Sequence, residues 1–183
     1  MKKATLIALT LLVALAAPVA HAEEPTFNVL ITGGAEQNVL SVKLSPDGRE
    51  YVIDSMAPLE IGGAVCTHPE AAENRLLCQA TAIAGFEVNA GGGNDSVAIS
   101  PKIQVPVTLR GGPGDDRLYG GGGADKLVGG PGDDALIGRA GNDALYGGPG
   151  NDQLLGGSGD DVLHGGPGDD EMVGGPGDNV LVP

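Results

Sequence analysis

Aspartate recurs at every ninth residue from position 116 onward in this 183-residue chain, within sequence that is very rich in glycine. Asp116, Asp134 and Asp152 are typical members of the series. A carboxylate offers hard oxygen atoms, and calcium prefers about six to eight such oxygens at ~2.3–2.6 Å. The residue type and its regular spacing therefore indicate cation binding as the chemistry of this segment.

The spacing belongs to an internal repeat with a period of nine, and we call one repeat a nonad. Residues 111–182 divide into eight consecutive nonads of the pattern G-G-x-G-x-D-x-U-x, where U is a large aliphatic residue. Position six holds Asp116, Asp125, Asp134, Asp143, Asp152, Asp161, Asp170 and, in the last nonad, Asn179. Position eight holds Leu118, Leu127, Leu136, Leu145, Leu154, Leu163, Met172 and Leu181. A weaker copy at residues 90–98 places Asp95 at position six.

One nonad cannot fold alone, because it buries a single aliphatic side chain. The first part of the nonad, up to its aspartate, is glycine-rich and predicts a turn, and the remainder is long enough for a short strand only. If successive nonads form opposite sides of a flattened coil, two nonads complete one turn of a parallel solenoid. Asp116 and Asp134 would then stack about 4.8 Å apart and repel by roughly 3 kcal/mol at an effective dielectric near 20. A calcium ion between them would relieve this repulsion, with turn carbonyls as further ligands.

The eight nonads resemble the repeat-in-toxin (RTX, hemolysin-type) calcium-binding repeat. The resemblance implies a right-handed parallel β-roll, with calcium held between nonads i and i+2 by the position-six side chains and turn carbonyls. The implied pairs are Asp116 with Asp134, Asp125 with Asp143, Asp134 with Asp152, Asp143 with Asp161, Asp152 with Asp170, and Asp161 with Asn179. Asp95 is the expected ligand of the upstream copy. We expect the Asn179 site to be weaker, because an amide keeps an oxygen but loses the charge.

Two further features of the array bear on its folding. Arg139 stands where the second glycine of its nonad belongs, which affects the expected turn conformation. The array also carries so much glycine that we expect it to be largely disordered without calcium, since ordering each glycine costs about 0.5–1 kcal/mol relative to alanine.

The N-terminal segment, residues 1–22, predicts a secretory signal peptide. Lys2 and Lys3 precede an apolar run from Ala4 to Ala17, and Ala20-His21-Ala22 fits the small-x-small cleavage pattern. Cleavage would leave Glu23 as the first residue. We therefore expect a secreted protein, extracellular or periplasmic, with no membrane insertion of the mature chain.

Residues 23–89 predict a β-rich region that caps the solenoid, and residues 90–183 the calcium-binding β-roll, so the fold class is all-β. Pro46-Asp47-Gly48 lies between two β-like runs and predicts a hairpin turn. Cys66 and Cys78 are the two cysteines of the chain, and in an oxidising compartment they favour a disulfide bond. A two-cysteine metal site would need histidine partners, and His68 alone lies close in the sequence.

The formal net charge of −14 excludes nucleic acid as a favoured partner and attracts cations. We find no catalytic motif, and His21, His68 and His164 are more typical of surface residues than of a catalytic group. We therefore predict a non-enzymatic, exported calcium-binding repeat protein. The alternative is a calcium-dependent adhesion or interaction protein that presents its N-terminal region to a protein or glycan partner.

Overall fold

The computed structural model describes residues 9–10, 12–15, 27–55, 59–60, 66–67, 75–79 and 83–183. Every regular element within these residues is a β-strand, which confirms the all-β prediction. The same residues contain no helix with the length and apolarity needed to cross a bilayer.

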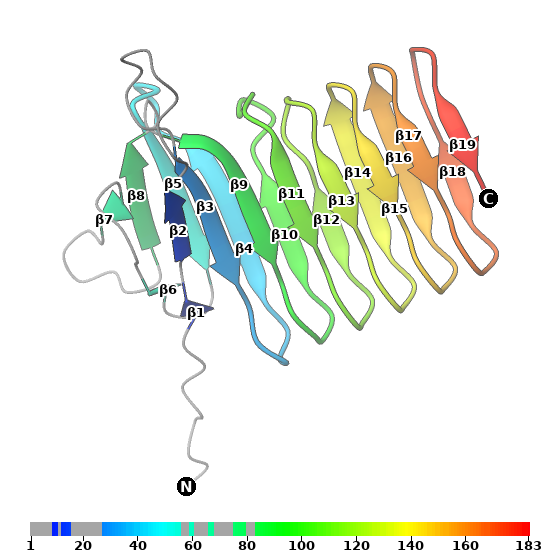
Figure 1. The fold of residues 1–183 in the computed structure, drawn as a ribbon, viewed down its shortest axis with the longest axis horizontal. Helices are drawn as coiled ribbons and strands as arrows, with labels where there is room; N and C mark the ends of the chain where they lie inside the picture. The colour runs from blue at the N-terminus through cyan, green and yellow to red at the C-terminus, as the bar shows by residue number, and fades with distance from the viewer. Residues whose placement is uncertain are drawn as a thin grey trace, which may run out of the picture.

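Most strands belong to two long sheets, whose strands stack along the length of the molecule (Figure 1). The first sheet contains, in spatial order, β18 (Glu171–Val173), β16 (Gln153–Ser158), β14 (Ala135–Ala140), β12 (Arg117–Tyr119), β10 (Ser96–Ile99), β4 (Val39–Leu44), β5 (Glu50–Ser55), β8 (Arg75–Gln79) and β7 (Cys66–Thr67). The second sheet contains β19 (Val180–Val182), β17 (Val162–His164), β15 (Ala144–Tyr146), β13 (Lys126–Val128), β11 (Val107–Arg110), β9 (Ile83–Asn89), β3 (Phe27–Thr32) and β2 (Leu12–Leu15). A separate short pair consists of β1 (Leu9–Thr10) and β6 (Leu59–Glu60).

Successive nonads supply strands to the two sheets in alternation. In the first sheet, Leu118 pairs with Leu136 and Leu136 with Leu154, always in parallel register. The second sheet repeats this arrangement, with Leu127 paired to Leu145. Each coil therefore takes two nonads, as the sequence period predicts, and the fold is a parallel β-roll.

The position-eight side chains form the core between the two sheets. Six consecutive leucines at this position are at most 2% exposed: Leu118, Leu127, Leu136, Leu145, Leu154 and Leu163. Burial of each contributes about 1.5–3 kcal/mol. The last coil lacks a following neighbour, and its Leu181 is 43% exposed. The aliphatic half of the repeat thus supplies the hydrophobic stabilisation, and the turns serve another purpose.

The two sheets continue upstream of the repeats recognised in the sequence. β4 pairs in parallel with β10, so that Leu40 lies beside Val97 at the position-eight level. β3 pairs in parallel with β9. Residues 33–41 therefore form a degenerate nonad, G-G-A-E-Q-N-V-L-S, in which Asn38 takes position six. The repeat pattern does not reveal this copy, because its glycine at position four and its aspartate are both replaced.

Antiparallel strands extend the first sheet beyond β4. β4 and β5 form the predicted hairpin, with Leu44 opposite Tyr51. In its turn, Asp47 accepts hydrogen bonds from the Ser45 hydroxyl at 2.6 Å and from the Arg49 N–H at 3.2 Å. β8 pairs with β5 and β7 with β8, and this last pairing sets the backbone of Cys66 directly opposite that of Cys78.

Two short strands, β1 and β2, fall within the predicted signal peptide. β2 pairs antiparallel with β3 at one edge of the second sheet. The predicted cleavage site and residues around it lie outside the described residues, as does His68. The signal peptide and the domain boundaries thus stay predictions.

Candidate metal centre

The glycine-rich turns lie in two rows along opposite long edges of the solenoid (Figure 1). The first row joins the second sheet to the first through residues 33–38, 90–95, 111–116, 129–134, 147–152 and 165–170. The second row returns the chain through residues 120–125, 138–143, 156–161 and 174–179. Every position-six residue named from the sequence therefore ends one of these turns, and residues two nonads apart are neighbours in one row.

The turn at residues 129–134 shows why three of its positions hold glycine. Gly130 and Gly132 have φ values of 127° and 139°, a region that side chains disfavour. A Cβ at Gly129 would lie 2.2 Å from Oδ2 of Asp134, and one at Gly130 would lie 2.1 Å from the Gly112 carbonyl oxygen. Glycine thus lets consecutive turns and the position-six carboxylate approach one another closely.

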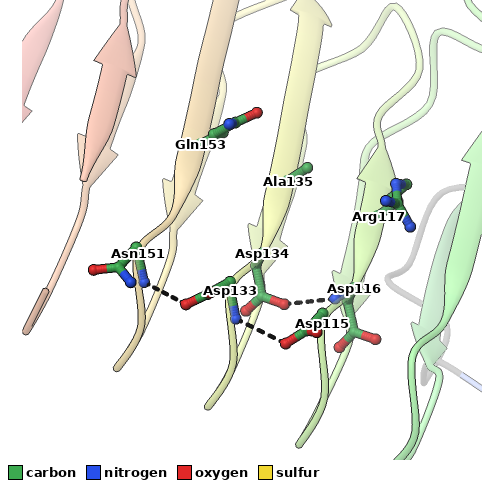
Figure 2. A pocket seen from close by; sticks show the side chains of 8 residues that line it. All are labelled: Asp115, Asp116, Arg117, Asp133, Asp134, Ala135, Asn151 and Gln153. Atoms are coloured by element: carbon green, nitrogen blue, oxygen red, sulfur yellow. Dashed lines mark hydrogen bonds between the residues drawn. The ribbon is translucent and has the colours of Figure 1, made fainter. Parts of the chain in front are cut away.

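A ladder of hydrogen bonds connects the position-six side chains. Oδ1 of Asp134 accepts from the backbone N–H of Asp116 at 2.8 Å (Figure 2). Oδ1 of Asp152 accepts in the same way from Asp134, also at 2.8 Å. The same bond brings together each of the remaining pairs expected from the sequence: Asp125 with Asp143, Asp143 with Asp161, Asp152 with Asp170, and Asp161 with Asn179. Asp95 joins the ladder by donating its N–H to Asp116 at 2.7 Å.

The second carboxylate oxygen of most of these aspartates has no partner. Oδ2 is buried and accepts no hydrogen bond in six described residues: Asp95, Asp116, Asp134, Asp143, Asp152 and Asp161. A buried polar atom without a partner is costly, and a buried charge more so. Six such oxygens at equivalent positions make each of these turns a favourable place for a positive group.

Backbone carbonyls supply the other oxygens of these turns. The N–H groups of Gly130 and Gly132 donate to the carbonyls of Gly147 and Pro149 in the next turn of the row. From residue 90 onward in the first row, this pattern engages the carbonyls of positions one and three, and these bonds between turns do not involve the carbonyls of positions two and four. Among the described residues, no three Asp, Glu, His or Cys side chains gather closely enough to hold a metal. A cation here would therefore be bound by few carboxylates and by several backbone carbonyls.

The buried carboxylates hold their protons unusually tightly. Burial raises the pKa of Asp116 to about 6 and that of Asp134 to about 7. The pKa values of Asp125 and Asp143 rise to about 6 and about 7 for the same reason. Backbone hydrogen bonds oppose this rise, and neighbouring carboxylates add to it, as Asp116 and Asp152 do for the pKa of Asp134. The site is therefore electrostatically unfavourable for ionised carboxylates in the absence of a cation.

A second polar ladder, at position five, was not identified in the sequence. Oδ1 of Asp115 accepts from the N–H of Asp133 at 3.1 Å, and Oδ1 of Asp133 accepts from that of Asn151 at 2.8 Å. These side chains are exposed, and beside Asp116 and Asp134 they line a hollow of about 320 Å³ (Figure 2). The signal for this ladder is the presence of Asp or Asn at position five in every nonad of residues 111–182 except that of Ala124.

The turn at residues 120–125 differs from the others. Oδ2 of Asp125 accepts a hydrogen bond from the Gly121 N–H at 2.6 Å, and Oδ1 accepts from Val107 at 2.9 Å. Arg139 has a φ of 86° and donates from Nη1 to the carbonyl oxygens of Ile99 and Gly120, the latter at 2.6 Å. Its guanidinium lowers the pKa of Asp125 against the larger effect of burial. The turn of Asp125 thus has its Oδ2 engaged by a backbone N–H, and its Gly120 carbonyl engaged by the side chain of Arg139 from the next turn of the row.

The family comparison agrees with this geometry. A model described as the RTX calcium-binding nonapeptide repeat (4 copies) matches residues 108–136, 119–154 and 146–181. Residues 108–181 are RTX calcium-binding repeats. Comparisons with curated proteins and with solved structures return no match.

RTX repeats bind calcium, which identifies the cation of this array. The site is suited to it, because orphaned carboxylate oxygens and free turn carbonyls are both hard oxygen donors. A β-roll of RTX repeats is a structural calcium-binding arrangement rather than a typical enzyme fold. His164 stacks on Tyr146, with ring centroids 5.5 Å apart.

Proposed function

We propose that this chain is an exported calcium-binding protein whose repeat array folds when it binds several calcium ions. The six buried Oδ2 atoms without a partner are the observation that carries the proposal. Calcium supplies a divalent charge that several oxygens share. The array needs such a charge, because the six aspartates with an orphaned oxygen are at most 2% exposed.

The residues that would hold calcium are those with an orphaned oxygen. They are Asp95, Asp116, Asp134, Asp143, Asp152 and Asp161. Asp170 ends the first row, is half-buried, and accepts from the N–H of Asp152 at 3.0 Å. It would complete a site with Asp152. Asp125 and Asn179 present no such oxygen to their turns, and they are not part of this set.

Calcium removal tests the proposal directly. After chelation we expect the purified chain to lose most of its β-strand circular dichroism, and millimolar calcium to restore it with several ions bound per chain. When free calcium is at 100 times the dissociation constant of a site, its binding adds about 2.7 kcal/mol to the free energy of unfolding. Several such sites together therefore contribute as much as the whole stability of many domains. Magnesium serves as the control, because it demands a tighter octahedral shell. A spectrum that chelation and calcium leave unchanged would contradict the proposal.

Export and a disulfide bond are further parts of the proposed function. An exported chain would begin at Glu23 and would meet oxidising conditions, where the opposed backbones of Cys66 and Cys78 favour a bridge. Cys78 is fully buried, which would protect the bond. We expect the mass of the secreted chain, without reductant, to match residues 23–183 with one disulfide. A mass that includes residues 1–22, or two alkylatable thiols, would oppose this part.

A further inference from the structure

The last nonad carries an amide where the others carry a carboxylate. Oδ1 of Asn179 accepts from the N–H of Asp161 at 2.8 Å, as the aspartates do in their turns. Its Nδ2 donates to the carbonyl oxygens of Gly175 at 2.8 Å and Gly177 at 3.4 Å. These are the position-two and position-four carbonyls of the same turn. The amide nitrogen thus binds the oxygens that remain free in the turns with an orphaned Oδ2.

Asn38, at the opposite end of the other row, also donates from Nδ2 to turn carbonyls. Its backbone N–H donates to Oδ1 of Asp95 at 2.6 Å, which continues the position-six ladder. Its Nδ2 donates to the carbonyl oxygens of Glu36 at 2.6 Å and Ala90 at 3.1 Å. The same nitrogen lies 3.2 Å from Oδ1 of Asp95. An N–H donor again faces oxygens of the turn and of the next carboxylate.

The turn of Asp125 is the third case. The Gly121 N–H engages Oδ2 of Asp125, and Arg139 engages the Gly120 carbonyl. This turn begins the second row, and the segment before it is the irregular loop at residues 100–106 rather than a nonad. The Gly122 N–H donates to Ile103 of that loop at 2.7 Å. Gly121 and Gly123 consequently lack the positive φ of their counterparts in later turns.

All three turns lie at the end of a row, where one neighbouring nonad is missing. A cation at such a position would find fewer oxygens than one between two complete turns. We propose that the chain closes these three turns to metal with its own donors: Asn38, Asn179, and the Gly121 N–H with Arg139. Calcium loading is thereby confined to the remaining turns, which run from that of Asp95 to that of Asp170 in the first row and comprise those of Asp143 and Asp161 in the second. This inference rests on the proposed calcium binding and identifies the residues that limit it.

Three single variants of the full chain, each assayed for bound calcium by titration calorimetry, test the inference. Asp143→Asn and Asp125→Asn form a matched pair, because the two residues are neighbours in one row and lose the same charge. We expect Asp143→Asn to lose at least one ion and Asp125→Asn to lose none. We expect Asn179→Asp to gain one weaker ion, because the carboxylate would leave the Gly175 and Gly177 carbonyls without a donor.

Circular dichroism at saturating calcium establishes that each variant is folded. Asn179 lies in the exposed last turn, so its variant keeps the test valid if Asp125→Asn does not fold. Equal losses for Asp125→Asn and Asp143→Asn, or no gain for Asn179→Asp, would overturn the inference while leaving calcium binding intact. A parent chain that binds no calcium would instead refute the proposed function.

Discussion

Replacing Asp134, Asp143, Asp152 and Asp161 together with asparagine is expected to produce a repeat array that folds without calcium. Asn179 shows that an asparagine at position six keeps the Oδ1 hydrogen bond and satisfies two turn carbonyls through Nδ2. The substitution also removes buried charge. For Asp134, whose pKa rises from 3.8 to about 7, ionisation in the folded state costs on the order of 4 kcal/mol.

Asp143, whose pKa also rises to about 7, carries a similar penalty, and the two penalties together are comparable to the stability of a typical domain, which is about 5–15 kcal/mol. We therefore expect the calcium-free variant to show the circular dichroism of the calcium-loaded parent, and to respond little to added calcium. The measurement is the spectrum with and without chelator, together with the number of ions bound.

The position-five ladder provides the control for net charge. Asp133, Asp160, Asp169 and Asp178 are exposed, and their replacement with asparagine removes the same number of charges from the same rows of turns. This control variant should still need calcium to fold. If both quadruple variants fold equally well without calcium, general charge repulsion rather than the buried oxygens is responsible. If the position-six variant stays unfolded in either condition, the amide does not replace the cation.

Acidification should stabilise the calcium-free fold and weaken calcium binding. The folded-state pKa of Asp143 is about 7, against an ordinary value of 3.8, so between these values the folded state binds more protons than the unfolded state. Stability then falls as pH rises from about 4 to about 7 and levels off above that. Calcium competes with the same protons, so its affinity changes in the opposite direction.

We expect the calcium-free chain to be more structured at pH 5 than at pH 8 by circular dichroism. As the pH falls below 7, the calcium dissociation constant of each site that must release one proton should rise about tenfold per pH unit. The position-six variant with four asparagines should show both effects more weakly, because it lacks Asp134 and Asp143, whose pKa values rise to about 7. A calcium-free chain that loses structure on going from pH 8 to pH 5 would contradict the raised pKa values.

The nonad period alone was sufficient to predict the coil and its core. Position-eight residues such as Leu136 were expected to be buried, because this position holds a large aliphatic residue in every nonad, and the glycine-rich first part of the nonad predicted the turns. The stacking of Asp116 on Asp134 then followed from a coil of two nonads. The RTX resemblance and calcium follow from the same spacing, and the family comparison confirms both.

The ends of the rows could not be predicted in this way. Whether Asp125 offers an oxygen to a cation depends on the loop at residues 100–106 and on Arg139, which approach it only in the folded chain. Asn38 occupies position six by virtue of the parallel pairing of β4 with β10, while its nonad keeps too few of the repeat residues to be recognised. Sequence period determines which side chains stack, because it is a property of every repeat. Tertiary structure decides which of the stacked oxygens lack a hydrogen-bond partner, because the available donors depend on the groups that pack beside each turn.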